Sequence, residues 1–388
     1  LAVFSESPRK LSELTRRFAR YHTLFTAIGK FVLLNLPTFL SAKGWSFMVA
    51  TDDFSGFSQA LIRWQKSFGR HNLPWQVTDP YRRWLSEIML QQTQVSVVAD
   101  YFARFIAAYP TLKDLAQADE DDVMRLWAGL GYYSRARNLL ACAKVLVRDW
   151  GGVFPQHVKD LMTLPGIGQS TAGAVASFSF DAQAPIMDGN VKRVFARVLA
   201  LATPLEVAAT QKTLWEFAQA RVPKKDPGIY NQALMDIGSL VCTRTNPKCE
   251  TCPIRAWCKA FALGQPLLFP VRKEKRAKPE KETCMLLYTH GDRLWLTKRE
   301  GNGVWRGLWS LPERPSCSGE PIATFLHTFS HYRLHARIYE IAWPDGKTDP
   351  GKGKWIAWSD IEAEALAAPV KRALLALRAQ LPDFVFSV

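Results

Sequence analysis

Apolar residues recur at helical spacing through the first two thirds of the chain. Between residues 94 and 109 they occupy one face of a helix, which Pro110 ends. Asp119 is expected to cap the next short helix, and Ser134 to cap a longer one. Further helices are predicted at 157–163, 170–180, 190–201, 208–221 and 228–241. No alternating pattern competes with them, so residues 48–265 are predicted to form an all-α domain.

The periodicity changes after residues 266–282, a basic linker punctuated by prolines. Strands are predicted at 284–289 and 294–298 around the turn signal His-Gly-Asp-Arg, with further strands within 323–343 and a final helix at 369–380. Residues 283–388 are therefore expected to form a second domain of the α+β class.

Residues 1–47 share neither pattern. They hold seven basic and two acidic residues and one apolar run, which is short and broken by Asn35 and Pro37. We expect a poorly ordered extension, with a signal or transit peptide as the alternative. No stretch of the sequence reaches the length of a transmembrane helix, so we expect no membrane partner.

The charge of the chain points to a polyanionic partner. The 388 residues include 50 Lys and Arg against 35 Asp and Glu, a formal net charge of +15. Such an excess favours nucleic acid or an anionic membrane surface, although solvated basic faces are also common. The length allows two or three domains.

Four of the seven cysteines fall close together. They form the pattern Cys242-x6-Cys249-x2-Cys252-x5-Cys258, whereas the other three are scattered. An odd number with one tight group indicates metal binding in a reducing compartment instead of disulfides. Four thiolates on a looping segment can hold an iron–sulfur cube or one zinc ion. Zinc sites usually contain two Cys-x2–4-Cys pairs and this segment has one, so the spacing favours iron–sulfur.

Two further motifs lie upstream of the cysteines. The turn Pro165-Gly166-Ile167-Gly168 between short helices would expose backbone N–H groups that bind a phosphate without reading sequence. Asp188 precedes Gly189-Asn190 and is well suited to cap a helix. Alone, this motif favours a structural cap, but a carboxylate at a helix N-terminus is also kept ionised and could be catalytic.

The order of the motifs identifies a resemblance. Residues 85–93 (Leu-Ser-Glu-Ile-Met-Leu-Gln-Gln-Thr), 130–133 (Leu-Gly-Tyr-Tyr), 164–172 and 188–193, followed by the four cysteines, resemble the endonuclease III superfamily. Within it the chain is similar to the adenine DNA glycosylases of the MutY family, from about Phe57 to the C-terminus. The resemblance implies a helix-hairpin-helix glycosylase domain, one 4Fe-4S cluster on the four cysteines, and a Nudix-like domain that recognises 8-oxoguanine. The implied partner is double-stranded DNA with adenine mispaired to 8-oxoguanine or guanine.

Two carboxylates carry the implied chemistry. Glu87 would be the general acid that protonates adenine N7, which requires burial to raise its pKa, and an ionised Asp188 would stabilise the oxocarbenium-like sugar. Ser170 stands where strand-cleaving relatives carry a lysine nucleophile. We therefore expect a monofunctional glycosylase that leaves an abasic site.

The resemblance also assigns binding residues. Those for DNA are Gln92 and Tyr132, which would pry open the duplex, and Gly166, Gly168, Ser170, Asn190 and Lys192. Gln232 and Trp75 would bind adenine, and Phe329, Ser330 and His331 would contact 8-oxoguanine. Each also has a structural reading, as a packed aromatic or an exposed polar side chain. No Nudix box is present, so the second domain is expected to bind and not to hydrolyse.

Three other functions compete with this interpretation. They are a thymine- or pyrimidine-specific glycosylase, a non-catalytic iron–sulfur protein that binds DNA or senses redox state, and a phosphohydrolase acting through the second domain. Ser170 and Gln232 argue against the first, and the second leaves Glu87 and Asp188 unexplained. The resemblance further implies a monomer in the cytoplasm of a bacterium, associated with DNA.

Overall fold

The structure is a computed structural model that describes residues 53–273, 277–301, 303–344 and 346–380. The prediction for residues 1–47 lies outside the described residues. No described helix has the length and apolar character that a membrane crossing requires.

Helices account for the regular structure up to residue 262, as predicted. They are α2 Phe57–Phe68, α3 Pro80–Leu90, α4 Val95–Ala108, α5 Leu112–Gln117, α6 Glu120–Trp127, α7 Ser134–Asp149, α8 Val158–Leu161, α9 Gln169–Phe180, α10 Gly189–Leu199, α11 Ala208–Arg221, α12 Pro227–Leu240 and α13 Lys259–Ala262. Asp119 caps α6, since its side chain accepts from the Asp121 amide. The cap predicted at Ser134 is wrong: Ser134 is the first residue of α7 and makes no capping bond. The reason is that Tyr133 already has helical angles and the chain enters the helix one residue early.

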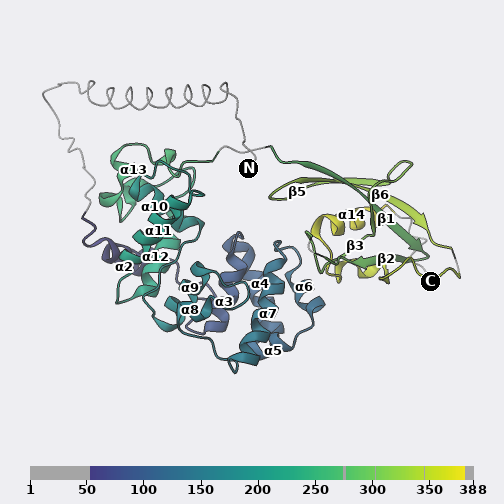
Figure 1. Cartoon of the computed structure of the whole chain (residues 1–388), viewed down its shortest axis with the longest axis horizontal. Coiled ribbons are helices and arrows are strands. Elements are labelled where there is room, and N and C mark those ends of the chain that lie inside the picture. Colours follow the sequence, from purple (N-terminus) through teal and green to yellow (C-terminus); the bar gives the residue numbers. More distant parts are fainter. Residues whose placement is uncertain (1–52, 274–276, 302, 345, 381–388) are drawn as a thin grey trace, which may run out of the picture. The chain divides into compact units, whose positions relative to one another are not determined.

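The helices form two groups with α9 between them (Figure 1). Trp84, Phe105 and Leu139 are buried in the group around α3, α4 and α7, and Phe57 and Phe195 in the group around α2, α10 and α12. Helix α9 packs on both α3 and α12. This is possible because its own buried residues, 172–177, are small and allow neighbouring helices to approach on more than one side. This close packing brings Glu87, on α3, near Asp188, which directly precedes α10.

The second domain is built on a mixed sheet. Its strands are β1 Glu280–His290, β2 Arg293–Lys298, β3 Trp309–Ser310, β4 Glu313–Arg314, β5 Ala323–Thr328, β6 Arg333–Ala342 and β7 Lys354–Ala357, followed by α14 Ala368–Arg378. The order is β3-β2-β1-β6-β5, with β4 on β1 and β7 on β2. Strands β1 and β6 are parallel, and the other pairs are antiparallel. The predicted hairpin is confirmed, since Thr289 pairs with Leu294 and His290 with Arg293.

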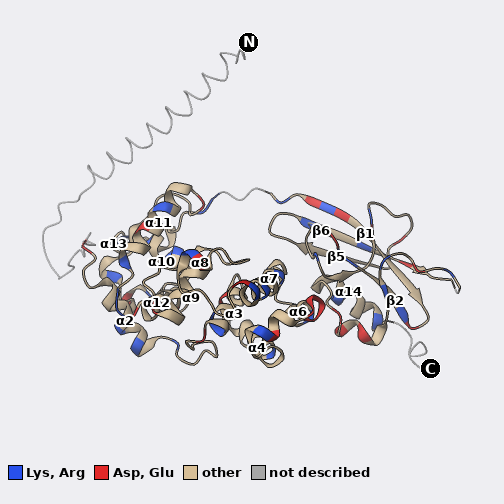
Figure 2. Ribbon diagram, turned by 60° about the horizontal axis from the view of Figure 1, so that its bottom comes forward, with Lys and Arg blue, Asp and Glu red and all other residues tan. Residues whose placement is uncertain are grey.

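Strand β1 begins at Glu280, inside the segment expected to be a linker. The first residues of β1 are charged and exposed (Figure 2), so the sequence shows no alternating apolar pattern there. They pair with an equally charged part of β6, where Glu280 lies 3.3 Å from Arg333 and Glu282 lies 3.2 Å from Arg337. Opposite charges across the strands thus extend the sheet beyond its apolar part.

Candidate active site and cysteine loop

Glu87 lies on α3, one turn after Arg83. The Arg83 guanidinium donates from Nε to the Val77 carbonyl at 2.7 Å and lies 4.6 Å from the centre of the Phe178 ring. Burial raises the pKa of Glu87 to about 7; the charge of Arg83 opposes this shift and that of Asp188 adds to it. Although the side chain keeps some contact with solvent, its carboxyl group holds a proton near neutral pH. This is the direction that the sequence interpretation required.

Asp188 occupies the cap of α10, where its Oδ1 accepts from the Val191 amide at 2.7 Å. Burial raises the pKa of Asp188, while backbone hydrogen bonds from Val191 and Asn190 oppose the rise. The capping bonds favour the ionised form, as expected of a helix N-terminus, but desolvation outweighs them and the net shift of the pKa is upward. Asp188 thus caps α10 and also lies close enough to Glu87 for its charge to affect the pKa of that residue. A structural role as a cap and a catalytic role are therefore compatible.

Ser170 connects the predicted hairpin to Asp188. Its hydroxyl accepts from the Met187 amide at 2.9 Å, which fixes the segment leading into α10. In the turn before α9, Gly166 has a φ of 75°, and a Cβ there would lie 2.7 Å from that of Asn138. Glycine is therefore required at this position for both conformation and space. Gly168 is exposed at the N-cap of α9.

The two residues expected to enter the duplex share an unusual backbone conformation. Gln92 has a φ of 59° and Tyr132 a φ of 48°, both in the left-handed region. Gln92 is exposed, and 49% of the Tyr132 surface is accessible. Non-glycine residues in this region are uncommon and concentrate at functional sites.

The remaining predicted DNA contacts lie on α10. Asn190 accepts a hydrogen bond from Arg193 at 2.9 Å through its Oδ1. Lys192 is partly exposed on the same helix. Asn190 is thus tied to the helix that Asp188 begins.

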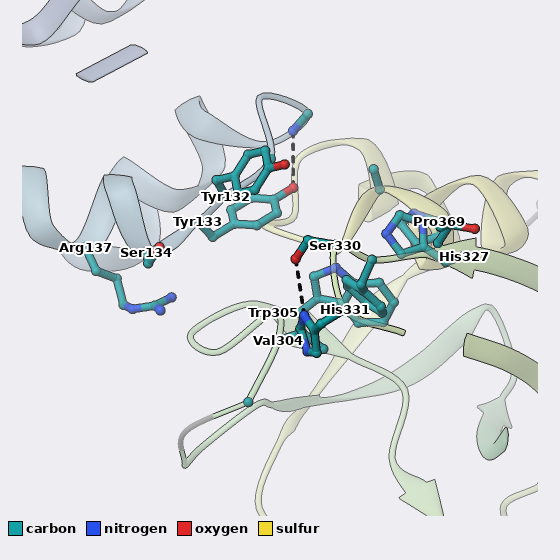
Figure 3. A pocket seen from close by; sticks show the side chains of 16 residues that line it. Tyr132, Tyr133, Ser134, Arg137, Val304, Trp305, His327, Ser330, His331 and Pro369 are labelled. Carbon is teal, nitrogen blue, oxygen red and sulfur yellow. Dashed lines mark hydrogen bonds between the residues drawn. The ribbon is translucent and has the colours of Figure 1, made fainter. Parts of the chain in front are cut away.

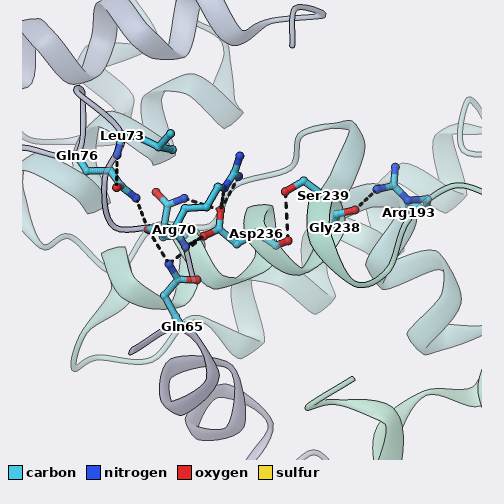
Figure 4. A network of polar contacts seen from close by, with 9 residues as sticks. Gln65, Arg70, Leu73, Gln76, Arg193, Asp236, Gly238 and Ser239 are labelled. Carbon is cyan, nitrogen blue, oxygen red and sulfur yellow. Dashed lines mark hydrogen bonds and ion pairs between the residues drawn. The ribbon is translucent and has the colours of Figure 1, made fainter. Parts of the chain in front are cut away.

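A cavity of about 850 Å³ lies beside Arg83 and is lined by Gln232, Phe178 and Gln76 among others. Gln232 is 9% exposed, and its Nε2 donates to Asp236 Oδ1 at 3.0 Å. Figure 4 shows Asp236 with its other donors, Gln65 and Arg70. The sequence interpretation missed this buried carboxylate; its signal is the spacing of four residues from Gln232 on one helix face.

Trp75 is placed differently from what its predicted role suggests. It is 2% exposed and lies edge-on to Phe102, with ring centres 5.5 Å apart. It is buried in the core around α3 and α4 and does not line the cavity that contains Gln232.

The four clustered cysteines line one small cavity together with Arg197 and Arg255. Arg197 donates to Cys242 Sγ at 3.2 Å and to the Thr243 carbonyl at 2.7 Å. Among the described residues, no three His, Cys, Asp or Glu side chains are placed to hold a single metal ion. Burial raises the pKa of Cys252 and of Cys258, so binding of iron has to displace their protons. The shared cavity and its cationic surroundings fit a cluster bound by thiolates.

In the second domain, Phe329, Ser330 and His331 form the turn between β5 and β6. The ring centre of Phe329 lies 4.9 Å from that of Trp305, and Ser330 Oγ lies 3.2 Å from His331 Nδ1. These residues line a cavity of about 630 Å³ together with Tyr132 (Figure 3). The structure thus brings three predicted lesion contacts and one predicted wedge residue to the same cavity.

Comparisons with known proteins agree with this arrangement. Residues 85–219 match the family model of HhH-GPD superfamily base excision DNA repair proteins, and residues 283–376 match the NUDIX domain. Residues 242–258 match the iron–sulfur binding domain of endonuclease III, which identifies the cysteine loop as an iron–sulfur site.

Relatives with the same name occur in bacteria and animals. An adenine DNA glycosylase of Buchnera aphidicola subsp. Baizongia pistaciae is 39% identical over 66% of this chain and 73% of its own length. One of Buchnera aphidicola subsp. Acyrthosiphon pisum is 36% identical over 72% of this chain and 84% of its own length. One of Homo sapiens is 31% identical over 85% of this chain and 75% of its own length. On these similarities, the chain belongs to the adenine DNA glycosylase family.

Proposed function

We propose that this protein hydrolyses the N-glycosidic bond of adenine mispaired with 8-oxoguanine or guanine in duplex DNA and leaves an abasic site. One observation carries the proposal: burial beside Asp188 raises the pKa of Glu87 to about 7. A carboxyl group that is both protonated and deprotonated near neutral pH can serve as acid and then as base.

The two carboxylates divide the reaction between them. Glu87 gives its proton to adenine N7, and the glycosidic electron pair leaves with the base. Asp188, ionised for this step, stabilises the positive charge that develops on the sugar. Glu87 then takes a proton from the water that attacks the sugar carbon. No amine is available at Ser170 to attack instead, so the strand remains intact.

Gln232 is suited to read adenine in the cavity beside Arg83. Asp236 forms an ion pair with Arg70, and a carboxylate in such a pair only accepts hydrogen bonds, so the Gln232 amide turns its NH2 group toward it. In the part of the chain that the structure describes, Gln232 Oε1 accepts no hydrogen bond. It is therefore free to accept one from the 6-amino group of adenine. Trp75 remains a predicted adenine contact, although its core packing favours a structural role.

We infer that DNA is bound by the turns that carry Gln92 and Tyr132 and by the N-terminal ends of α9 and α10. Gln92 and Tyr132 would fill the space that the extruded base leaves. The backbone amides at Gly166 and Gly168, with Ser170, Asn190 and Lys192, would hold phosphates without reading sequence. We infer a monomer that acts on DNA in the bacterial cytoplasm; two bacterial relatives support this location.

The turn of Phe329, Ser330 and His331 would distinguish 8-oxoguanine from guanine. The oxidised base has an additional oxygen and an N7 hydrogen, for which Ser330 and His331 supply both donors and acceptors. A site that bonds such groups discriminates strongly against a base without them. This turn would then favour the oxidised mispair while adenine chemistry stays at Glu87.

Replacement of the carboxylates tests the chemistry. Glu87→Gln should abolish adenine release while mismatch binding persists, because the amide keeps its shape but cannot protonate N7. Asp188→Asn should slow the reaction about 100- to 1000-fold, the effect of losing one electrostatic contact to the transition state. The measurement is single-turnover adenine release, with the exposed Glu216→Gln as control. Rates within about tenfold of wild type would remove both residues from the mechanism.

The pH dependence tests the protonation state of Glu87. Its acid form is lost as pH rises through about 7, so kcat/KM should fall roughly tenfold per pH unit above that value. Toward acid pH the rate should decline as Asp188 takes up a proton, and because burial raises its pKa this decline begins at a higher pH than for a free aspartate. A profile that stays flat through neutral pH would contradict Glu87 as the acid.

Substitution in the second domain tests lesion recognition. The full chain with Ser330→Ala and His331→Ala should lose more activity on 8-oxoguanine:adenine than on guanine:adenine. The ratio of the two single-turnover rates is measured at one salt concentration, since phosphate contacts make affinity salt-dependent. Ser359→Ala, a surface serine of the same domain, should leave the ratio unchanged. Equal losses on both duplexes would show that the turn supplies only general affinity.

Metal content tests the cysteine loop. The purified chain should be yellow-brown and contain about four iron and four sulfide per molecule, the composition of a cubane on four thiolates. Cys252→Ser should lower the iron content, whereas Cys142→Ser, at a buried thiol outside the loop, should retain it. Colourless protein with stoichiometric zinc would refute the iron–sulfur site.

A further inference from the structure

One buried arginine has bonds that the proposed function does not use. Arg135, on α7, is only 7% exposed. Its NH1 donates to the carbonyls of Ile88, Met89 and Gln91 at 2.9, 2.8 and 2.6 Å, and its NH2 to the carbonyls of Leu130 and Gly131 and to Thr93 Oγ1 at 3.1, 3.0 and 3.3 Å. Within the described residues, no carboxylate pairs with it. Burial lowers the pKa of Arg135 to about 10, so it remains charged at neutral pH.

The acceptors belong to two separate turns. The carbonyls of Ile88, Met89 and Gln91 lie at the end of α3, where a helix leaves its last carbonyls without partners. Those of Leu130 and Gly131 lie in the turn that precedes α7. One guanidinium therefore joins the end of α3 to the turn before α7.

Each of these turns carries one of the left-handed residues. Gln92 directly follows the acceptor Gln91, and Tyr132 directly follows the acceptor Gly131. Such a backbone conformation persists only where the surroundings impose it. The guanidinium carbon of Arg135 also lies 5.6 Å from the centre of the Tyr132 ring, which adds a cation–π contact.

We propose that Arg135 is a positioning residue for base extrusion, which holds the turns of Gln92 and Tyr132 as one rigid unit so that both side chains enter the duplex together. The proposal rests on the proposed function, because it assigns Arg135 to the step before glycosidic cleavage. Arg135 acts through the two turns and touches neither the base nor the sugar.

Lysine cannot replace this arrangement. The guanidinium is a planar fork: among the described residues, NH1 bonds only to carbonyls at the end of α3, whereas NH2 alone reaches the turn before α7. An ammonium group offers one nitrogen. Arg135→Lys keeps the charge and much of the volume but should release one of the two turns. Arg148→Lys, at an exposed position on the same helix, is the matched control.

The test compares an adenine that must be extruded from a pair with one that has no opposite base, and each variant's rate is divided by the wild-type rate on the same duplex. Single-turnover release is measured from an 8-oxoguanine:adenine duplex and from a duplex in which the adenine is an unpaired bulge. Arg135→Lys should slow the paired substrate at least about tenfold more than the bulged one, since misplacing a group remote from the chemistry can cost about that much. Fluorescence of 2-aminopurine beside the adenine should show slower extrusion, and Arg148→Lys should match wild type in both.

The outcomes separate the possible failures. Equal slowing on both substrates, or none on either, overturns the positioning role, whereas a wild-type chain that releases adenine from neither duplex refutes the proposed function itself. If Arg135→Lys does not fold, Thr93→Val, which removes one acceptor and keeps the shape, should lower the paired-to-bulged ratio to a smaller extent. An unchanged ratio in a folded Thr93→Val chain then overturns the proposal.

Discussion

The hydrogen bonds of two arginines on α10 join the helix that Asp188 caps to the cysteine loop. Arg193 donates to the Gly238 carbonyl at 2.6 Å (Figure 4). It also donates to the Cys242 carbonyl at 2.9 Å. Arg197, one turn later, donates to the sulfur of Cys242. Asp188 caps the first turn of the same helix. The position of Asp188 is therefore tied to a loop whose two short 3-10 turns contain no buried residue.

Desolvation is the second constraint on the site. Small side chains on α9 let the helices around it approach closely, and the segment before α10 passes so near that a Cβ on Gly173 would lie 2.1 Å from the Pro185 carbonyl. The site that results leaves Glu87 and Asp188 only partly accessible to water. Burial of two carboxyl groups is unfavourable for folding. The same burial raises the pKa of Glu87, as the proposed role of this residue as an acid requires.

The sequence predicted those features that depend on local spacing. Helical periodicity predicted the helix at 208–221 with the observed bounds, and spacing identified the four cysteines of the iron–sulfur loop. The roles of Glu87 and Asp188 stay predictions from the ordered motifs. Features that depend on tertiary contact were missed or misjudged. The charged start of β1 becomes a strand only through its ion pairs with β6. The pKa direction of Asp188 follows from burial that no sequence pattern reveals.

One bond of Arg197 reaches beyond the glycosylase part of the chain. Its Nε donates at 3.0 Å to the carbonyl of Phe269, at the start of the segment that leads to the second domain. The Arg197 guanidinium, which bonds to Cys242, therefore also holds the start of the segment that connects the glycosylase domain to the second domain. Any movement of the loop around Cys242 would therefore reach the start of the connection to the second domain as well as the helix that Asp188 caps.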